Sequence, residues 1–202
     1  KTDGAQDYDL ILRCTEETEH ICHIPRILYH WRSHEDSTAE NPESKRYAFE
    51  AGRRAVQAHF DRLGIPAEVT EGEYLGLYRT KYLWKEKPLV SVLIPNKDHT
   101  EDLDRCLQSL EKCTYKNLEY LIIENNSEEE ETFRYYEELE GRYPETVRVI
   151  TWEGSFNYAS INNFGADHAK GEYLILLNND IEVIAPGWME EMLGCCQRSD
   201  VG

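Results

Sequence analysis

Three polar residues that directly follow an apolar run are the candidates for chemistry in this sequence. Residues 173–177 are apolar and favour β structure, which predicts a buried strand, and Asn178, Asn179 and Asp180 come next. Ligands of open α/β sheets bind beyond the carboxyl ends of the strands. A single acid there suits Mg²⁺, which takes one or two protein carboxylates and fills its other positions with water and phosphate oxygens. The alternative is an ordinary turn, in which Asn and Asp are common.

Polar residues also follow two other predicted strands. Residues 89–95 are followed by Asn96, Lys97 and Asp98, and residues 118–123 by Glu124, Asn125, Asn126 and Ser127. Polar side chains at successive parallel strand ends are typical of a nucleotide crevice. The sequence has neither G-x-G-x-x-G after a strand nor G-x-x-x-x-G-K-[ST], which argues against dinucleotide and P-loop sites.

The elements that must position these residues alternate between strand and helix from Lys87 onward. Strands are predicted at 89–95, 118–123, 147–152 and 173–177, with helices from 100, from 127 to 141 and from 158 to 169. Thr100 is a candidate N-cap, and Ser127 with Glu130 has the spacing of a capping box. This alternation predicts an α/β fold with a Rossmann-like, doubly wound, mainly parallel sheet.

The first part of the chain predicts an α+β segment with a long helix. Residues 7–14 alternate loosely, residues 24–31 predict a strand, and a helix is expected from Asn41-Pro42 to Leu63. Small apolar residues on that helix indicate close packing against a neighbour. Residues 66–87 show no clear period and are interpreted as a linker. The predicted parts are therefore 1–65, the linker 66–87, and 88–202.

Composition and charge disfavour several classes of protein. The 202 residues carry a net charge of −17, whereas a nucleic-acid surface needs clustered Lys and Arg. The same charge disfavours an anionic membrane face, and no apolar run reaches the roughly 18 residues of a transmembrane segment. The six cysteines show no C-x-x-C pair and no zinc-ligand spacing, which favours a reduced cytosolic protein.

Four segments in the second part resemble family 2 glycosyltransferases, in the order in which that family carries them. They are Val92-Leu93-Ile94-Pro95-Asn96, Ile123-Glu124-Asn125-Asn126-Ser127, Asn163-Phe164-Gly165-Ala166 with Ala169-Lys170-Gly171-Glu172-Tyr173, and Leu177-Asn178-Asn179-Asp180. The resemblance implies the GT-A fold, a UDP- or dTDP-linked sugar donor, a glycan or lipid-linked acceptor, and Mg²⁺ or Mn²⁺. It also implies an inverting transferase of the hexosyltransferase type.

The resemblance assigns roles to individual residues. Asp180 takes the place of the metal-binding acid of the D-x-D motif, whose first Asp is Asn178 here, as in rhamnosyltransferase-like members. Glu124 stands where the family has an Asp that contacts the nucleoside. The implied donor site consists of Pro95, Asn96, Asp98, Glu124, Asn126, Asn163, Asn178 and Asn179.

The first part is similar to the acceptor half of the same family. Asp7, within Gly4-Ala5-Gln6-Asp7-Tyr8-Asp9-Leu10, takes the position of the catalytic base, with Gln6 replacing the usual Glu. Tyr29-His30-Trp31-Arg32, followed by His34, resembles the segment that closes over the donor diphosphate, which implies that His30, Arg32 and His34 lie on the diphosphate side. The alternative is a strand with an amphipathic edge followed by a polar loop.

The order of the two halves is reversed relative to a complete family member. The simplest interpretation is a window of a tandem enzyme, which joins the end of one catalytic domain to the start of the next; the alternative is a circular permutation. We therefore expect a glycosyltransferase of cell-surface polysaccharide synthesis, cytoplasmic and at the inner face of the membrane in the full-length protein. The alternatives are a nucleotide-binding module without turnover and a nucleotidyltransferase of similar fold.

Overall fold

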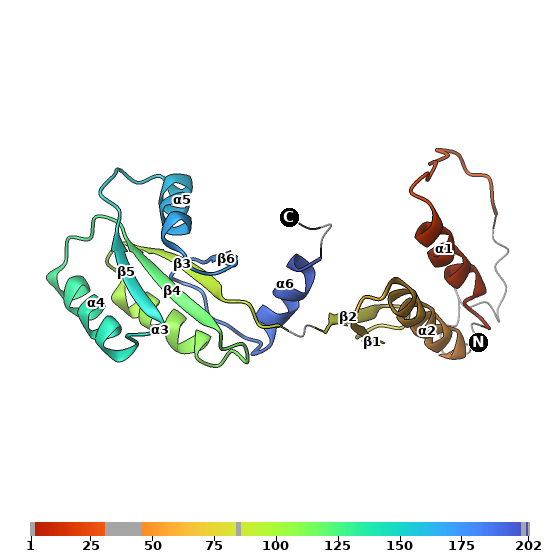
Figure 1. Cartoon of the computed structure of the whole chain (residues 1–202), viewed down its shortest axis with the longest axis horizontal. Helices are drawn as coiled ribbons and strands as arrows, with labels where there is room; N and C mark the ends of the chain where they lie inside the picture. The colour runs from red at the N-terminus through yellow and green to blue at the C-terminus, as the bar shows by residue number, and fades with distance from the viewer. Residues whose placement is uncertain (1–2, 31–45, 84–85, 199–200, 202) are drawn as a thin grey trace. The chain divides into compact units, whose positions relative to one another are not determined.

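The computed structural model describes residues 3–30, 46–83, 86–198 and 201, and the chain divides into two compact units, Lys1–Trp84 and Lys85–Gly202. Figure 1 shows the helices and strands of each unit. The second unit carries the candidate donor-site residues and Asp180, whereas Asp7 and His30 belong to the first unit.

The second unit is a parallel sheet with helical crossovers. Its elements are β3 (Val90–Asn96), α3 (Thr100–Leu110), β4 (Leu118–Glu124), α4 (Glu130–Arg142), β5 (Val147–Thr151), α5 (Tyr158–His168), β6 (Tyr173–Leu176) and α6 (Trp188–Cys196). The strands lie in the order β5-β4-β3-β6, and each neighbouring pair is parallel. The predicted α/β fold with a doubly wound parallel sheet is therefore confirmed.

Each face of this sheet has its own hydrophobic core, because successive side chains of a strand point to opposite faces. Val92 and Ile94 of β3 face a core built from α3, α4 and α6, including Leu107 and Leu139. Leu93 faces a smaller core that contains Leu121, Ile123 and Ile161 of α5. Figure 1 shows α3 and α4 on one side of the sheet and α5 on the other. The sheet is thus fixed from both faces, which holds its strand ends in place.

Both predicted helix caps of the second unit differ from the structure. The N-cap of α4 is Glu129 and not Ser127, because Ser127 directs its hydroxyl back to the Glu124 carboxylate at 2.6 Å. The N-cap of α3 is His99 and not Thr100. His99 and the preceding Asp98 both have left-handed backbone conformations, with φ of 49° and 51°. The chain turns into α3 through these two residues.

The described residues of the first unit form two helices and a β-hairpin, which corrects three expectations. Its elements are α1 (Gln6–Glu17), α2 (Arg46–Leu63), β1 (Ala67–Glu71) and β2 (Tyr78–Tyr82). Residues 7–14 are helical, and residues 24–30 form no strand; Trp31 and the expected start of the long helix lie outside the described residues. Residues 66–83 are no bare linker, since β1 and β2 pair in an antiparallel hairpin.

The hairpin packs on a face of α2 that consists of small residues, and side chains of α2 form hydrogen bonds with its backbone. Ala51, Gly52 and Ala55 are buried, which confirms the predicted close packing. A Cβ at Gly52 would lie 2.2 Å from the Tyr78 hydroxyl oxygen, so only Gly fits beside that ring. The Gln57 amide donates to the Ala67 carbonyl and accepts from the Val69 N–H, both at 2.9 Å. These contacts give two short strands a partner that the sequence does not reveal.

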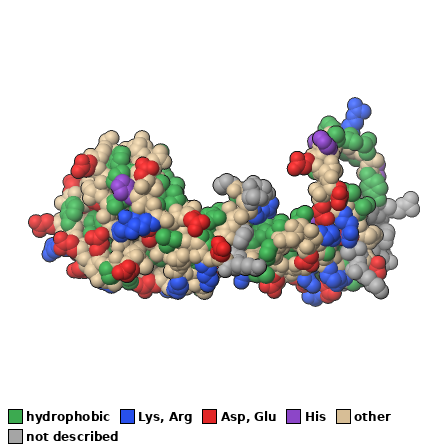
Figure 2. Space-filling model, in the orientation of Figure 1, with side chains coloured by type: hydrophobic (Ala, Val, Ile, Leu, Met, Phe, Trp, Pro, Cys, Tyr) green, Lys and Arg blue, Asp and Glu red, His purple; other side chains and the backbone are tan. Residues whose placement is uncertain are grey.

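Several large apolar side chains are exposed among the described residues of the first unit. The Glu16 carboxylate ties α1 to α2 by accepting hydrogen bonds from Arg62 at 2.6 and 2.7 Å. On the other side of α1, Leu10 and Ile11 are each 60% exposed, and the segment that follows exposes Ile27 by 85%. Figure 2 shows hydrophobic side chains at the surface of that segment. Within the described ranges, no helix has the length and apolar character needed to cross a membrane.

Candidate functional site

The carboxyl ends of β3, β4 and β6 meet at one edge of the sheet, because the three strands are parallel neighbours. Asn96 and Glu124, the last residues of β3 and β4, are paired in register. The residues after β6 reach the same edge, since the Asn179 amide donates to the Asn96 side-chain oxygen at 2.6 Å. The structure therefore brings together the three strand ends that the sequence predicts to form a crevice.

A continuous chain of hydrogen bonds runs along this edge. Asn96 receives the amide of Asn179 and donates its own amide to the Tyr136 hydroxyl at 2.8 Å. Tyr136 donates in turn to the Glu124 carboxylate, also at 2.8 Å. Burial raises the pKa of the Tyr136 hydroxyl, so it stays protonated and donates at neutral pH. The segment after β6 and the turn after β4 are joined through one buried phenol.

The Glu124 carboxylate closes the turn between β4 and α4. It is 3% exposed and accepts from the backbone N–H and the hydroxyl of Ser127, at 2.5 and 2.6 Å, in addition to the bond from Tyr136. Opening of the turn would leave this buried carboxylate without its hydrogen-bond donors, which is costly in free energy. The three donors therefore hold the turn in one conformation. Glu124 thus shapes the turn that carries Asn125 and Asn126.

Asp98 binds the start of α4. Its carboxylate accepts from the backbone N–H groups of Glu128 and Glu129 at 3.0 and 3.1 Å, and from the Thr132 hydroxyl at 3.2 Å. Burial acts to raise the pKa of the Asp98 carboxyl, but these donors outweigh it and the pKa is lowered. A negative charge at a helix N-terminus is favourable. Asp98 therefore fixes the β3–α3 loop to α4.

Backbone conformations that are rare for residues other than Gly gather at the same edge. Asp98, His99 and Asn126 have φ values of 51°, 49° and 58°, and these are the positive-φ residues other than Gly among the described parts of the chain. Such conformations cost free energy and persist where the surroundings impose them, as happens at functional sites. Their position supports the strand ends as the place of function.

The segment Asn178–Asp180 presents its polar groups to solvent while its backbone is held. The side chains of Asn178 and Asp180 are exposed. Beneath them, the Cys106 thiol of α3 donates a weak hydrogen bond to the Asn178 carbonyl, with 3.8 Å between sulfur and oxygen. Burial first, and the nearby Asp180 carboxylate second, raise the pKa of this thiol to about 11. Cys106 is therefore a neutral support for the segment that carries Asp180.

The donor set around Asp180 determines which metal sites this edge can form. Nowhere in the described residues do three or more His, Cys, Asp or Glu side chains gather as a metal site would require. A metal with all-protein ligands, such as structural zinc, therefore does not fit here. One exposed carboxylate fits Mg²⁺ or Mn²⁺, if water and ligand phosphate oxygens complete the coordination. Asp180 is the residue that would hold such an ion.

The remaining candidate residues lie in several places. Pro95 is in β3 beside Asn96, and the Asn126 amide donates to the Gly154 carbonyl at 2.9 Å. Asn163 is exposed on α5, outside the hydrogen-bond chain.

Two further candidate residues, Asp7 and His30, belong to the first unit. The Asp7 carboxylate accepts a hydrogen bond from the Tyr8 N–H at 2.9 Å in the first turn of α1, and His30 is exposed. Arg32 and His34 lie outside the described residues.

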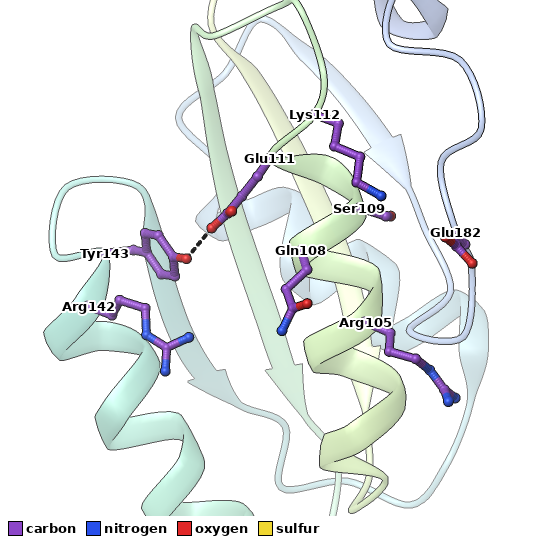
Figure 3. A pocket seen from close by; sticks show the side chains of 8 residues that line it. All are labelled: Arg105, Gln108, Ser109, Glu111, Lys112, Arg142, Tyr143 and Glu182. Carbon is purple, nitrogen blue, oxygen red and sulfur yellow. Dashed lines mark hydrogen bonds between the residues drawn. The ribbon is translucent and has the colours of Figure 1, made fainter.

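A hollow of about 660 Å³ lies over the outer side of α3, away from the strand ends (Figure 3). Its lining consists of Arg105, Gln108, Ser109, Glu111, Lys112, Arg142, Tyr143 and Glu182. The lining mixes both signs of charge, and two of its members, Tyr143 and Glu111, are hydrogen-bonded to each other. None of the strand-end residues takes part in it. The polar edge of the sheet remains the candidate site.

Sequence reasoning missed Tyr136 and Cys106, two residues that organise this edge. Both lie on helices, and their spacing with other apolar residues of α3 and α4 marks them as core residues. The Tyr136 hydroxyl contacts residues 12 and 40 positions away in the sequence. The one available signal is chemical, because a buried phenol needs a hydrogen-bond partner.

Three comparisons place this geometry among known proteins. Residues 91–201 match the sequence profile described as "Glycosyl transferase family 2". The chain is 40% identical over 201 residues to the O-antigen biosynthesis protein RfbC of Myxococcus xanthus. That alignment covers 99% of this chain and 16% of RfbC. The chain is 39% identical over 204 residues to the uncharacterized protein y4gI of Sinorhizobium fredii, with 99% and 22% covered. The chain thus spans less than a quarter of the length of these relatives.

Among solved structures, the chain is similar to the mannosyltransferase PcManGT from Pyrobaculum calidifontis, determined in complex with GDP-Man and Mn²⁺. The TM-score is 0.53 at 16% identity, over 78% of this chain and 44% of PcManGT. At this level of identity the likeness concerns the fold.

Proposed function

The chain belongs to glycosyl transferase family 2 and has the GT-A fold, and from this premise we propose that residues 86–198 bind the nucleotide-sugar donor of a glycosyltransferase. The observation that carries the proposal is the hydrogen-bond chain from Asn179 through Asn96 and Tyr136 to Glu124. It builds one polar edge from three strand ends, with Asp180 exposed beside it. That is where open α/β sheets bind nucleotides.

In this proposal, Asp180 holds a divalent cation against the donor diphosphate. When bound, the ion acts as a Lewis acid that stabilises the negative charge of the departing diphosphate, typically by several kcal/mol. The chain's own residues bind and orient the donor. Asn178 and Asp180 face the solvent where the diphosphate would lie, and the turn at Asn126, fixed by Glu124, lies where the nucleoside would bind. PcManGT, whose fold is similar, binds GDP-Man with Mn²⁺, which supports this arrangement.

The first unit fits the acceptor half of a separate catalytic domain that precedes residues 86–198 in a tandem enzyme. Its uncovered apolar surface, with Leu10, Ile11 and Ile27 exposed, supports this proposal, because monomers rarely leave large apolar patches uncovered. A nucleotide-binding half like the second unit would cover it. In that preceding site Asp7 is the base that takes the acceptor hydroxyl proton, opposite the leaving group, which gives inversion. Asp7 and Asp180 then serve different sites.

The wider role that we propose is synthesis of a cell-surface polysaccharide. The relative RfbC is named an O-antigen biosynthesis protein, which supports this class of product. The donor is expected to be UDP- or dTDP-linked, the acceptor a glycan or a lipid-linked glycan, and the place of action the cytoplasmic face of the membrane. A nucleotide-binding module without turnover is the second candidate, favoured by Asn178 at the position of the first metal-binding Asp.

Calorimetric titration of the chain with UDP and with dTDP, each with and without Mn²⁺, tests the donor site. We expect Mn²⁺ to tighten binding of one of them by at least about tenfold, since a cation held by Asp180 would offset the negative charge of the diphosphate. ADP serves as the control nucleotide. Equal nucleotide affinity with and without Mn²⁺ would contradict the proposed role of the metal.

A separate assay distinguishes the nucleotidyltransferase alternative. Formation of a sugar nucleotide and pyrophosphate from a sugar phosphate and a nucleoside triphosphate would contradict the transferase proposal and favour a nucleotidyltransferase.

The tandem arrangement predicts that Asp7→Asn leaves nucleotide binding by this chain unchanged within about twofold. The reason is that Asp7 completes a site whose nucleotide half lies elsewhere. We also expect no sugar transfer by this chain alone, measured by release of UDP from UDP-sugars in the presence of acceptor glycans. Turnover by this chain that is lost on Asp7→Asn would show one assembled site and a permuted enzyme.

A further inference from the structure

We propose that the Tyr136 hydroxyl is a positioning group that couples the metal side of the donor site to its nucleoside side. The inference rests on the proposed function for the identity of the two sides, and on the geometry for the coupling. Tyr136 comes from α4, whereas Asn96 and Glu124 end two strands of the sheet. Its hydroxyl is the group that both side chains share.

The inner members of the connection are removed from solvent, and Asn179 at its end is half-buried. Tyr136 is 4% exposed and Asn96 is 2% exposed. The bonds from Asn96 to Tyr136 and from Tyr136 to Glu124 are both 2.8 Å long, and the bond from Asn179 to Asn96 is 2.6 Å long. Hydrogen bonds in a site of low dielectric constant are strong and polarise one another. A displacement at either end is therefore transmitted along the chain.

The phenol joins two side chains that make no hydrogen bond to each other in the structure. The Asn96 amide nitrogen donates to the Tyr136 hydroxyl, and that hydroxyl donates to the Glu124 carboxylate. A hydroxyl can serve as this intermediate because it both accepts and donates. Replacement of Tyr136 by Phe keeps the ring in the core and removes this single bridging atom.

Each partner keeps a second contact without Tyr136, so the loss is one of coupling and not of folding. The Asn96 amide still donates to the Asp98 carbonyl at 2.7 Å. The Glu124 carboxylate still accepts from the Ser127 hydroxyl and N–H. Both turns therefore persist, and the backbones stay joined through the strand pairing and the bond from the Asn125 N–H to the Asn96 carbonyl at 2.9 Å. The Asn96 side chain, and with it Asn179, is no longer tied to the Glu124 carboxylate, so the side-chain link between the Asp180 segment and the nucleoside turn is lost.

The functional consequence is cooperativity between Mn²⁺ and the nucleotide. Ordering of the Asn178–Asp180 segment by the metal fixes Asn179, which fixes Asn96, Tyr136 and the Glu124 turn. The coupling free energy is reciprocal, so bound nucleotide also tightens the site for Mn²⁺. The Tyr136 hydroxyl would thereby contribute part of the Mn²⁺ enhancement of nucleotide binding.

Tyr136→Phe tests the inference, and Tyr135→Phe is the matched control. Tyr135 is the neighbouring residue of α4, and its hydroxyl donates to Asp104 at 3.0 Å, outside the chain of bonds. Hydrogen exchange of the ligand-free proteins is the first measurement. We expect faster exchange in both 124–128 and 177–181 for Tyr136→Phe, by at least about fivefold, and in neither segment for Tyr135→Phe. Equal exchange of 177–181 in the two variants would overturn the inference.

UDP titration with and without Mn²⁺ is the second measurement. Tyr136→Phe is expected to reduce the Mn²⁺ enhancement, which is the ratio of UDP affinities with and without Mn²⁺, by at least about fivefold, whereas Tyr135→Phe is expected to keep it. An equal loss with and without Mn²⁺ would also overturn the inference, because it indicates a merely structural role. If the wild-type chain shows no Mn²⁺ enhancement but the exchange result holds, the metal role in the donor proposal fails and the structural coupling through Tyr136 stands.

Discussion

Replacement of Asp180 by Ala is expected to abolish the Mn²⁺-dependent part of nucleotide binding, a loss of at least about tenfold in affinity. Asp180 provides the one exposed carboxylate at the end of β6, and the described residues offer no cluster of acids that could replace it. Because the side chain is exposed, the free energy of unfolding should change by less than about 0.5 kcal/mol. Calorimetry with UDP and Mn²⁺, together with urea unfolding, measures both quantities.

Glu182→Ala is the matched control for this experiment. Glu182 is an exposed acid two residues further along the same segment, so its removal changes the net charge by the same amount. We expect this control variant to keep its Mn²⁺ dependence. Equal losses in the two variants would mean that general electrostatics, and not a ligand at Asp180, attracts the metal.

Gly171→Ala is expected to destabilise the second unit by about 2–3 kcal/mol, because the added methyl group overpacks the sheet. A Cβ at this position would lie 2.6 Å from the Ser91 nitrogen and 2.7 Å from the Leu89 carbonyl oxygen. Both are backbone atoms of the neighbouring chain segment, which cannot rotate away. The Glu172 N–H bond to that same Leu89 carbonyl, 2.9 Å long, would be strained as well.

Urea unfolding measures this effect, with Gly187→Ala as the control. A Cβ at Gly187 would meet only the Thr114 hydroxyl, at 3.9 Å, so the expected change is limited to the loss of the Gly N-cap of α6, less than about 1 kcal/mol. A Gly171→Ala protein as stable as this control would show that β6 can shift away from β3. In that case the position of Asn179 would depend less on the start of the strand than the geometry indicates.

A partly buried ion pair and its hydrogen bonds hold the turn that precedes β6. The Glu119 carboxylate accepts from the Ser91 hydroxyl and the Lys170 N–H, both at 2.5 Å, and pairs with Arg148 at 3.1 Å. Burial acts to raise the pKa of this carboxyl, but its hydrogen bonds and Arg148 lower it overall. The turn before β6 is thereby fixed to the sheet, so the strand can deliver Asn178–Asp180 to a defined place.

Local sequence patterns predict the parallel sheet and its strand ends because both depend on short-range periodicity. The apolar runs of β3, β4 and β6 end where polar residues begin, which places Asn96, Glu124 and Asn178 at one edge. The bridge through Tyr136 depends on contacts between distant residues, and no local pattern contains them. The roles of the individual side chains at this edge stay predictions.

The first unit shows where local patterns mislead. Residues 24–30 are apolar enough for a strand, but a strand needs a partner, and the described residues supply none. Residues 67–71 and 78–82 have weak patterns yet form a hairpin, because Gln57 and the small residues of α2 receive them. In both cases tertiary contacts, and not local preference, decide whether a strand forms.

The strand order β5-β4-β3-β6 also has a consequence for synthesis of the protein. The chain leaves the ribosome with its N-terminus first, so β3, β4 and β5 are available before β6 is made. During that interval one edge of β3, a strand whose Val90, Val92 and Ile94 are fully buried in the finished fold, has no partner. Unpaired apolar edges recruit other chains. We therefore expect nascent chains that stop before residue 173 to be especially prone to aggregation. In a longer chain, β6 pairs with β3 and removes this unpaired edge.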